Sequence, residues 1–141
     1  MKLSTRVRYG VRAMIELAKQ PSDRPIPLRE LAQNQQISPK YLEQMAASLK
    51  IAGLIESVRG AEGGYRLARP AREITAWDIY NVLDVSVEPI ECLLSTACKR
   101  EPVCAARELW AEMTEAMTKI LKNKNLAHLA KREIELEKKS K

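Results

Sequence analysis

The first fifty residues alternate between apolar and polar positions with a helical period. Apolar residues recur at spacings of three and four from Val7 to Ala18, with Ser4 or Thr5 available as the N-terminal cap. A shorter stretch follows from residue 28, after a proline-rich loop. Ser38 and Pro39 then predict another helix start, because serine accepts from free backbone N–H groups and proline suits the first helical position. We therefore predict a helix-turn-helix whose second helix ends at Gly53.

The next segment has the pattern of a hairpin followed by a helix. Residues 54–58 and 65–67 are strand-like runs, and the segment between them is rich in glycine. A basic hairpin directly after such a helix is typical of the wing of a winged-helix domain. Thr75 and Asp78 have the spacing of a capping box, which predicts a helix that ends at Leu83.

The last third of the chain predicts a loop and two more helices. Residues 84–103 have little periodicity and predict an ordered loop. From Cys104 onward one apolar stripe runs at spacings of three and four: Leu109, Trp110, Met113, Met117, Ile120 and Leu121. We expect this stripe to pack on a second copy of the chain, the alternative being its own winged helix. A charged helix from Asn125 should fray from Glu135 onward.

These patterns together predict a mainly α fold with three parts. Residues 1–83 would form a winged helix-turn-helix DNA-binding domain with a small β-hairpin wing. Residues 84–103 would form a cysteine-bearing loop. Residues 104–141 would form a long dimerisation helix and a C-terminal helical tail.

Charge is divided unevenly along the chain. Residues 1–72 hold 13 Lys or Arg and 6 Asp or Glu, whereas residues 73–141 hold 11 and 12. Such asymmetry indicates a phosphate-binding surface, although a solvated basic face would look the same. No apolar run reaches the roughly 18 residues of a membrane span, and no signal peptide precedes the first helix, so we expect a cytoplasmic protein with no membrane partner. The chain has one histidine and neither a Ser/His/Asp set nor a phosphate loop, so we predict that it is not an enzyme.

The outward positions of the capped helix suggest how double-stranded operator DNA would be bound. Gln44 can pair with adenine, and Glu43 can accept from cytosine, so that Glu43 would discriminate between sequences. Basic residues near the wing suit phosphates or the narrow minor groove. The full set of predicted DNA-binding residues is Lys2, Ser38, Lys40, Tyr41, Glu43, Gln44, Lys50, Arg59 and Gly60. For each polar residue taken alone, simple solvation is the alternative.

Three cysteines, Cys92, Cys98 and Cys104, are the only ones in the chain, and five residues separate each from the next. In a reducing compartment, closely spaced cysteines are ligands or redox groups more often than structural disulfides. The spacing lacks the Cys-x2-Cys pairs of structural zinc sites. It favours an iron–sulphur cluster and leaves open zinc, a thiol/disulfide switch, or three unrelated buried thiols.

Three sequence segments and the cysteine spacing carry a resemblance to a known family. The segments are Lys2-Leu3-Ser4-x-x-x-Arg8-Tyr9-Gly10, Ile37-Ser38-x-x-Tyr41-Leu42-Glu43-Gln44, and the wing from Gly53 to Tyr65. Over about residues 1–125 the chain resembles the Rrf2 family of winged-helix regulators, and the cysteine spacing resembles its IscR type. The resemblance implies a homodimer and an iron–sulphur cluster on the three cysteines, 2Fe-2S favoured and 4Fe-4S possible. It further implies control of iron–sulphur biogenesis genes.

Two alternatives keep the fold and change the signal. One is a cluster-free regulator that responds to a thiol or redox signal, a metabolite or a partner protein. The other is a nitric-oxide-sensing repressor.

One position departs from the IscR-type pattern. Three residues after the third cysteine, where that type has a histidine ligand, this chain has Arg107. A guanidinium has no lone pair for a metal, so the fourth ligand is unassigned. Glu108 is our candidate, and Glu101 and Glu91 are other nearby oxygen donors. We expect His128 to be an exposed helix residue rather than a ligand.

Overall fold

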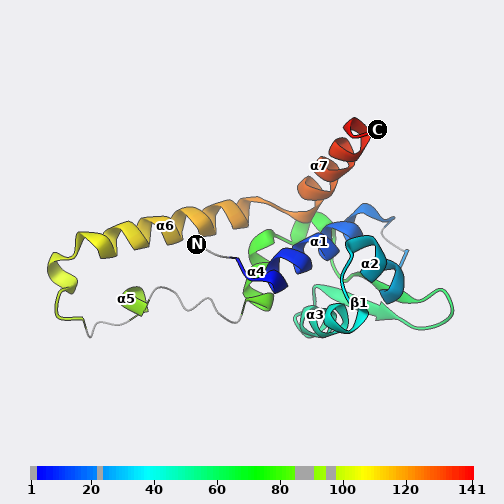
Figure 1. Cartoon of the computed structure of the whole chain (residues 1–141), viewed down its shortest axis with the longest axis horizontal. Helices are drawn as coiled ribbons and strands as arrows, with labels where there is room; N and C mark the ends of the chain where they lie inside the picture. Colours follow the sequence, from blue (N-terminus) through cyan, green and yellow to red (C-terminus); the bar gives the residue numbers. More distant parts are fainter. Residues whose placement is uncertain (1–2, 22–23, 85–90, 95–97) are drawn as a thin grey trace.

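In the computed structural model, a body of short helices carries one long helix that reaches away from it (Figure 1). The residues described are 3–21, 24–84, 91–94 and 98–141. The predicted DNA-binding residue Lys2 therefore lies outside the described residues.

The first three helices form as the sequence pattern predicts. α1 (Thr5–Lys19) is capped by Ser4, whose hydroxyl accepts from the Val7 N–H at 3.2 Å. After α2 (Leu28–Gln35), the chain turns at Gln36 in a left-handed conformation with φ 55°. α3 (Pro39–Ile51) has Ser38 as its cap and Pro39 in its first turn, and Gly53 follows its end with φ 74°.

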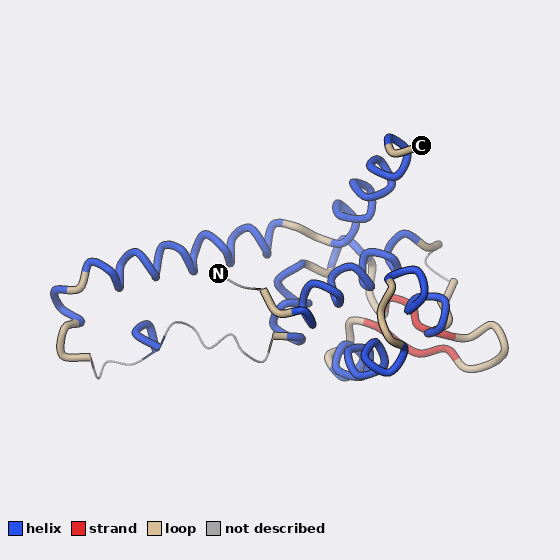
Figure 2. The backbone as a smooth tube through the Cα atoms, viewed as in Figure 1, coloured by secondary structure: helices blue, strands red, loops and turns tan. Residues whose placement is uncertain are grey.

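The wing is a two-stranded antiparallel sheet, shown in red in Figure 2. β1 (Ile55–Val58) pairs with β2 (Gly64–Leu67), Ile55 opposite Leu67 and Val58 opposite Gly64. A bridge between Ile26 and Tyr65 ties the sheet to the loop before α2. Gly64 is needed here because a Cβ at this position would lie 2.1 Å from the Ile26 carbonyl oxygen.

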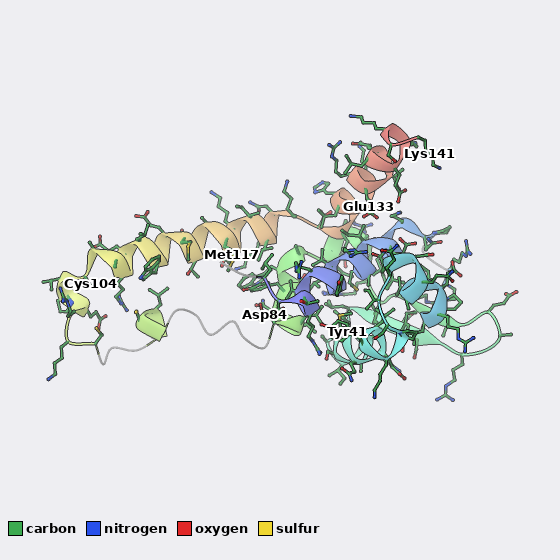
Figure 3. The ribbon with its side chains drawn as sticks, viewed as in Figure 1. Tyr41, Asp84, Cys104, Met117, Glu133 and Lys141 are labelled. Carbon is green, nitrogen blue, oxygen red and sulfur yellow. The ribbon has the colours of Figure 1, made fainter. Side chains whose placement is uncertain are left out.

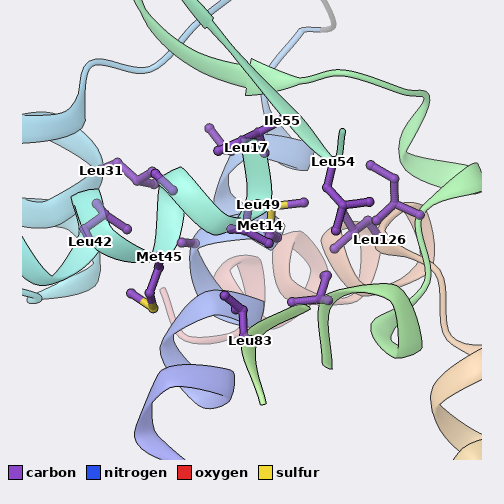
Figure 4. Close-up of a cluster of buried hydrophobic side chains, with 14 of the residues drawn as sticks. Met14, Leu17, Leu31, Leu42, Met45, Leu49, Leu54, Ile55, Leu83 and Leu126 are labelled. Carbon is purple, nitrogen blue, oxygen red and sulfur yellow. The ribbon is translucent and has the colours of Figure 1, made fainter. Parts of the chain in front are cut away.

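One hydrophobic core joins these helices to the base of the wing (Figure 4). α4 (Ala76–Leu83) follows a short 3-10 turn (Ala71–Glu73) and begins with the predicted capping box of Thr75 and Asp78. Leucine, isoleucine and methionine fill the core; the side chains buried most completely are Met14, Ile26, Met45, Ile74, Ile79, Leu83 and Leu126.

The segment predicted as a loop contains two short helical pieces. These are α5 (Glu91–Leu94) and a 3-10 turn (Glu101–Val103), and the rest of the segment includes residues 85–90 and 95–97, which lie outside the described residues. The prediction of loop alone is therefore wrong at these two places, which are too short to show helical periodicity in sequence. α6 (Ala105–Asn123) then runs back toward the body.

The C-terminal helix α7 (Leu126–Lys139) packs on α1. Leu126 lies fully inside the core, and the Lys19 ammonium pairs with the carboxylates of Glu133 and Glu137. The predicted fraying from Glu135 onward is wrong, because Glu137 is held by this contact and the helix continues to Lys139.

The mainly α winged-helix fold predicted from the sequence is confirmed. The division into parts at residues 83 and 103 stays a prediction. In the part of the chain that the structure describes, no helix has the length and apolar character needed to cross a membrane.

Candidate functional site

The exposed face of α3 carries most of the predicted DNA-binding residues. Lys40, Glu43 and Gln44 are exposed on its first turns, while its buried face consists of Leu42, Met45, Ala46 and Leu49. Ser38 is exposed too, and its hydroxyl accepts from the Tyr41 N–H at 3.2 Å. Two turns of one helix therefore present a donor, an acceptor and an amide side chain on one side of the molecule.

Tyr41 differs from its neighbours because its side chain is half-buried. Its ring meets the ring of Tyr9 of α1 edge to face, with centroids 6.3 Å apart. Helix α1 thus holds the Tyr41 ring in place. Sequence periodicity alone did not indicate this contact.

The remaining predicted DNA-binding residues lie at other places on this surface. Lys50 is exposed in the last turn of α3, and Arg59 and Gly60 are exposed between the two strands of the wing. Gly60 has φ 112° and an open environment, so this turn can approach a ligand closely. Lower on the wing, an ion pair of 2.6 Å between Arg66 and Glu56 joins the strands.

Arg12 is a residue that the sequence analysis did not select. Its Nε donates to the Gln35 side-chain oxygen at 3.1 Å, and its Nη2 donates to the Gln35 carbonyl at 2.8 Å. The guanidinium also lies 5.3 Å above the Tyr9 ring. Arg12 therefore joins the end of α2, just before the left-handed turn at Gln36, to Tyr9, whose ring packs against Tyr41. Only the tertiary contact reveals it, since Arg12 looks like any exposed basic residue in sequence.

Cys104 lies far from this surface, at the other end of α6 (Figure 3). Cys92 is in α5, Cys98 precedes the 3-10 turn, and Cys104 directly precedes α6. Cys92 and Cys98 are exposed and Cys104 is half-buried, so all three are free thiols that solvent can reach. The alternative of three buried thiols does not describe this arrangement.

Arg107 connects the three cysteine-bearing segments. Its Nε donates to the Cys92 carbonyl at 3.0 Å, and its backbone N–H donates to the Cys104 carbonyl at 3.2 Å. Its guanidinium also pairs with the Glu101 carboxylate at 3.2 Å. The Glu101 N–H in turn donates to the Cys98 carbonyl at 3.0 Å. The Arg107 side chain thus bridges the Cys92 backbone and the Glu101 carboxylate, three residues after Cys104 and next to the turn that follows Cys98.

The donor atoms suit a soft metal centre in kind, but they are not assembled as a ligand set. Within residues 3–21, 24–84, 91–94 and 98–141, no three His, Cys, Asp or Glu side chains form a group that could hold a metal ion. A cavity of about 410 Å³ opens beside Cys104, and Glu101, Arg107 and Glu108 are among its lining residues. Of the three cysteines only Cys104 lines this cavity, and thiolate sulphur is the donor that iron–sulphur clusters use.

The oxygen donors considered as a fourth ligand differ in their surroundings. The Glu101 carboxylate is engaged by Arg107, whereas Glu108 is exposed and borders the cavity. The side chain of Glu91 lies outside the described residues. His128 is exposed on α7, at the opposite end of α6 from the cysteines.

A helix-turn-helix whose second helix is capped and exposed, with a β-hairpin beside it, defines a winged-helix DNA-binding regulator of transcription. Comparison with known proteins identifies which kind. The profile of the Rrf2 family, described as iron-dependent transcriptional regulator, matches residues 3–132, and the chain belongs to this family.

Two similar proteins illustrate the range of the family. The regulator CymR of Bacillus subtilis is 43% identical over 130 residues, which cover 92% of this chain and 90% of that protein. The regulator IscR of Vibrio campbellii is 36% identical over 131 residues, covering 93% and 78%. Both are transcription regulators, so the prediction that this chain is not an enzyme is confirmed.

Two solved structures share the fold. That of CymR, the global cysteine regulator of B. subtilis, superposes with a TM-score of 0.81 at 39% identity, over 94% of this chain and 98% of that one. The structure of T. potens IscR gives 0.78 at 36% identity, over 94% and 88%.

Proposed function

We propose that this transcription regulator binds its operator under the control of an iron–sulphur cluster held by Cys92, Cys98 and Cys104. The observation that carries the proposal is that Arg107, at the start of α6, bridges the Cys92 backbone and Glu101, which brings the three cysteine-bearing segments to one place. The cluster would be 2Fe-2S, or 4Fe-4S, with Glu108 as the candidate for the fourth ligand. The family description as iron-dependent and the IscR relatives support iron as the metal.

On the DNA side, the first turns of α3 would enter the major groove. Glu43 and Gln44 would contact base edges, while Ser38, Lys40 and Tyr41 would fix the helix on the backbone. Lys50, Arg59 and Gly60, together with Lys2, would add contacts to phosphates and the minor groove. Apart from the half-buried Tyr41, the described residues of this set are exposed, which supports the assignment.

A homodimer would present two such surfaces to one operator. Leu109, Met113 and Ile120 leave 56%, 40% and 61% of their surface exposed along α6, and a second copy of the same helix would cover them. On the same helix, Met117 and Leu121 pack against the core of the body.

Contacts between successive helices connect the cysteine site to the DNA-binding helix α3. Cys104 directly precedes α6, α6 packs on α4, and α4 contacts both α1 and α3. When bound, the cluster would supply Fe–S bonds that draw the three thiolates together, and the ordered loop would set the pose of α6. We expect the two α3 helices of the dimer to shift with it, and the regulated genes to concern iron–sulphur or iron and redox balance.

The experiment is anaerobic purification followed by an absorption spectrum and iron and sulphide analysis. A brown protein with two or four irons per chain would support a cluster and set its type. Cys92→Ala protein should then lose the colour and change its affinity for, or its choice among, the operators that the wild type selects from genomic fragments. Unchanged affinity and preference would contradict the coupling.

A second candidate is a cluster-free regulator that responds to thiol or cysteine status. The observation that favours it is the higher identity to CymR, a cysteine regulator, at 43% compared with 36% for IscR. Two of the thiols would then form a disulfide by exchange with a low-molecular-weight disulfide, which is itself reduced to two thiols. A colourless protein after iron and sulphide reconstitution, with operator binding that depends on a reductant, would favour this candidate.

A further inference from the structure

Arg107 stands at the position of the histidine ligand in the IscR-type pattern. Its side chain nevertheless contacts other segments of the chain, which a solvated arginine would not do. It is about one-third exposed, and it donates to a carbonyl 15 residues earlier in the chain. Its ion-pair partner, Glu101, lies in a third segment and is itself tied to Cys98 through the backbone.

The chemistry of the guanidinium explains why arginine suits this task. Its donors form a rigid planar fork, so that one side chain can hold a carbonyl and a carboxylate at the same time. A lysine ammonium is a point charge on a flexible stem and holds two such partners in fixed directions less well. A neutral histidine has a single ring N–H to donate.

We propose that Arg107 is a positioning residue that gathers the segments bearing Cys92, Cys98 and Cys104 before any metal or oxidant acts on them. The inference rests on the proposed cysteine site but does not depend on which signal the site receives. It implies that the metal-free, reduced protein already keeps its thiols within reach of one another.

The test measures how readily two thiols of the metal-free protein are bridged. In a Cys98→Ser background only Cys92 and Cys104 remain, and the bifunctional thiol reagent dibromobimane becomes fluorescent when it links them. Bridging of a gathered loop is fast because the second thiol is at high effective concentration. Bridges within one chain are separated from bridges between chains on a denaturing gel.

Arg107→Ala should slow bridging by about five- to tenfold, the loss expected when charged hydrogen bonds near the surface are removed. The rate with monobromobimane, which labels one thiol at a time, should stay unchanged. Arg100→Ala is the matched control, because it removes the same charge from an exposed neighbour whose side chain has no hydrogen bond or ion pair among the described residues. Glu101→Gln, which removes the ion pair alone, should have an intermediate effect.

Equal bridging rates for Arg107→Ala and the parent protein would overturn the proposal, as would equal slowing by Arg100→Ala. A circular dichroism melt checks that each variant with slow bridging is folded. If Arg107→Ala is not folded, Glu101→Gln still tests the proposal. The outcome is separable from that of cluster binding. If bridging depends on Arg107 in a protein that takes up no iron, the positioning role is supported and the proposed cluster is contradicted.

Discussion

Individual side chains decide how the DNA-binding surface and the cysteine site are held. Polar contacts that link separate elements recur at both places, each centred on an arginine. At the DNA-binding surface, Arg12 braces the turn before α3, and in the cysteine site Arg107 holds the backbone of Cys92. Neither residue is distinguished in the sequence from a solvated arginine.

Replacing Arg12 by alanine should weaken operator binding by about tenfold without changing its salt dependence. The side-chain oxygen of Gln35, a residue only 8% exposed, would lose its donor, and the turn would loosen. Because Arg12 is engaged inside the protein, no phosphate contact is lost, and the slope of log affinity against log salt should stay constant. Fluorescence anisotropy with a labelled operator measures both quantities.

Arg8→Ala is the control for Arg12→Ala, since it removes an exposed charge from the same helix. A shallower salt slope in Arg12→Ala alone would assign Arg12 to a phosphate instead.

Replacing Glu108 by alanine should shorten the lifetime of the reconstituted cluster in air or shift its visible bands. Glu108 is the exposed carboxylate beside the cavity that includes Cys104. Glu112→Ala, one turn farther along α6, should leave both properties as in the wild type. If the spectra and lifetimes of all three proteins coincide, Glu108 is not a ligand.

At the scale of elements, helices α6 and α7 show two uses of an amphipathic pattern. α7 lays its apolar face on α1, whereas α6 leaves Leu109, Met113 and Ile120, half of its stripe, exposed. The periodicity of the two helices is similar, so the sequence pattern alone does not name the partner of either.

Replacing Leu109 and Ile120 of α6 by glutamate should convert a dimer into a monomer. These side chains are 56% and 61% exposed, and a buried carboxylate without a partner would oppose association. Sedimentation equilibrium measures the mass. Lys119→Glu, a change on the same helix at an exposed position outside the stripe, should not alter it. A double variant with the wild-type mass would place the dimer contact elsewhere.

The contact between α7 and α1 predicts an alkaline limit to stability. Burial disfavours the charged form of Lys19, but hydrogen bonds to Glu137 and Glu133, with the charges of Glu133 and Glu16, outweigh it and raise its pKa above 10.5. A group whose pKa is raised in the folded state contributes stability that is fully present below its unfolded-state pKa. That stability is lost as the pH rises through the folded-state pKa.

The free energy of unfolding of Lys19→Met should therefore fall below that of the wild type by a constant amount between about pH 7 and pH 9. Above about pH 10.5 the difference should shrink. Urea denaturation at a series of pH values measures it, with Lys131→Met, exposed on α7, as the control. A difference that stayed constant up to the highest pH would contradict the role of Lys19.

In the whole molecule, the two ends of the chain complete one core. Leu126 is fully buried in this core, and its N–H donates to the Ile74 carbonyl at 2.9 Å. The winged helix therefore depends on a residue more than forty positions beyond its last predicted helix.

Leu126→Ala should lower the free energy of unfolding by about 2–5 kcal/mol, the usual cost of such a cavity. Leu136→Ala removes the same atoms from the same helix, but Leu136 is 48% exposed, and its cost should be below about 0.5 kcal/mol. Chemical denaturation at equal protein concentration compares the two. Equal losses would show that α7 is not part of the core.

The sequence by itself determined the local elements of this protein. Caps, prolines and glycines act through neighbouring backbone groups, so Ser38, Gly53 and the Thr75–Asp78 box fix where helices begin and end. The winged-helix class and the family also follow from such local patterns taken in order. Short helical segments such as α5 were not predicted, because four residues are too few to show a helical period.

Only the tertiary structure decided which of these elements meet. The docking of α7 on α1, the bracing of Tyr41 through Tyr9 and Arg12, and the bond from the Arg107 side chain to the Cys92 carbonyl all join segments distant in sequence. Contacts of this kind depend on where whole helices lie, and the identity of an arginine does not record whether it faces water or a carbonyl.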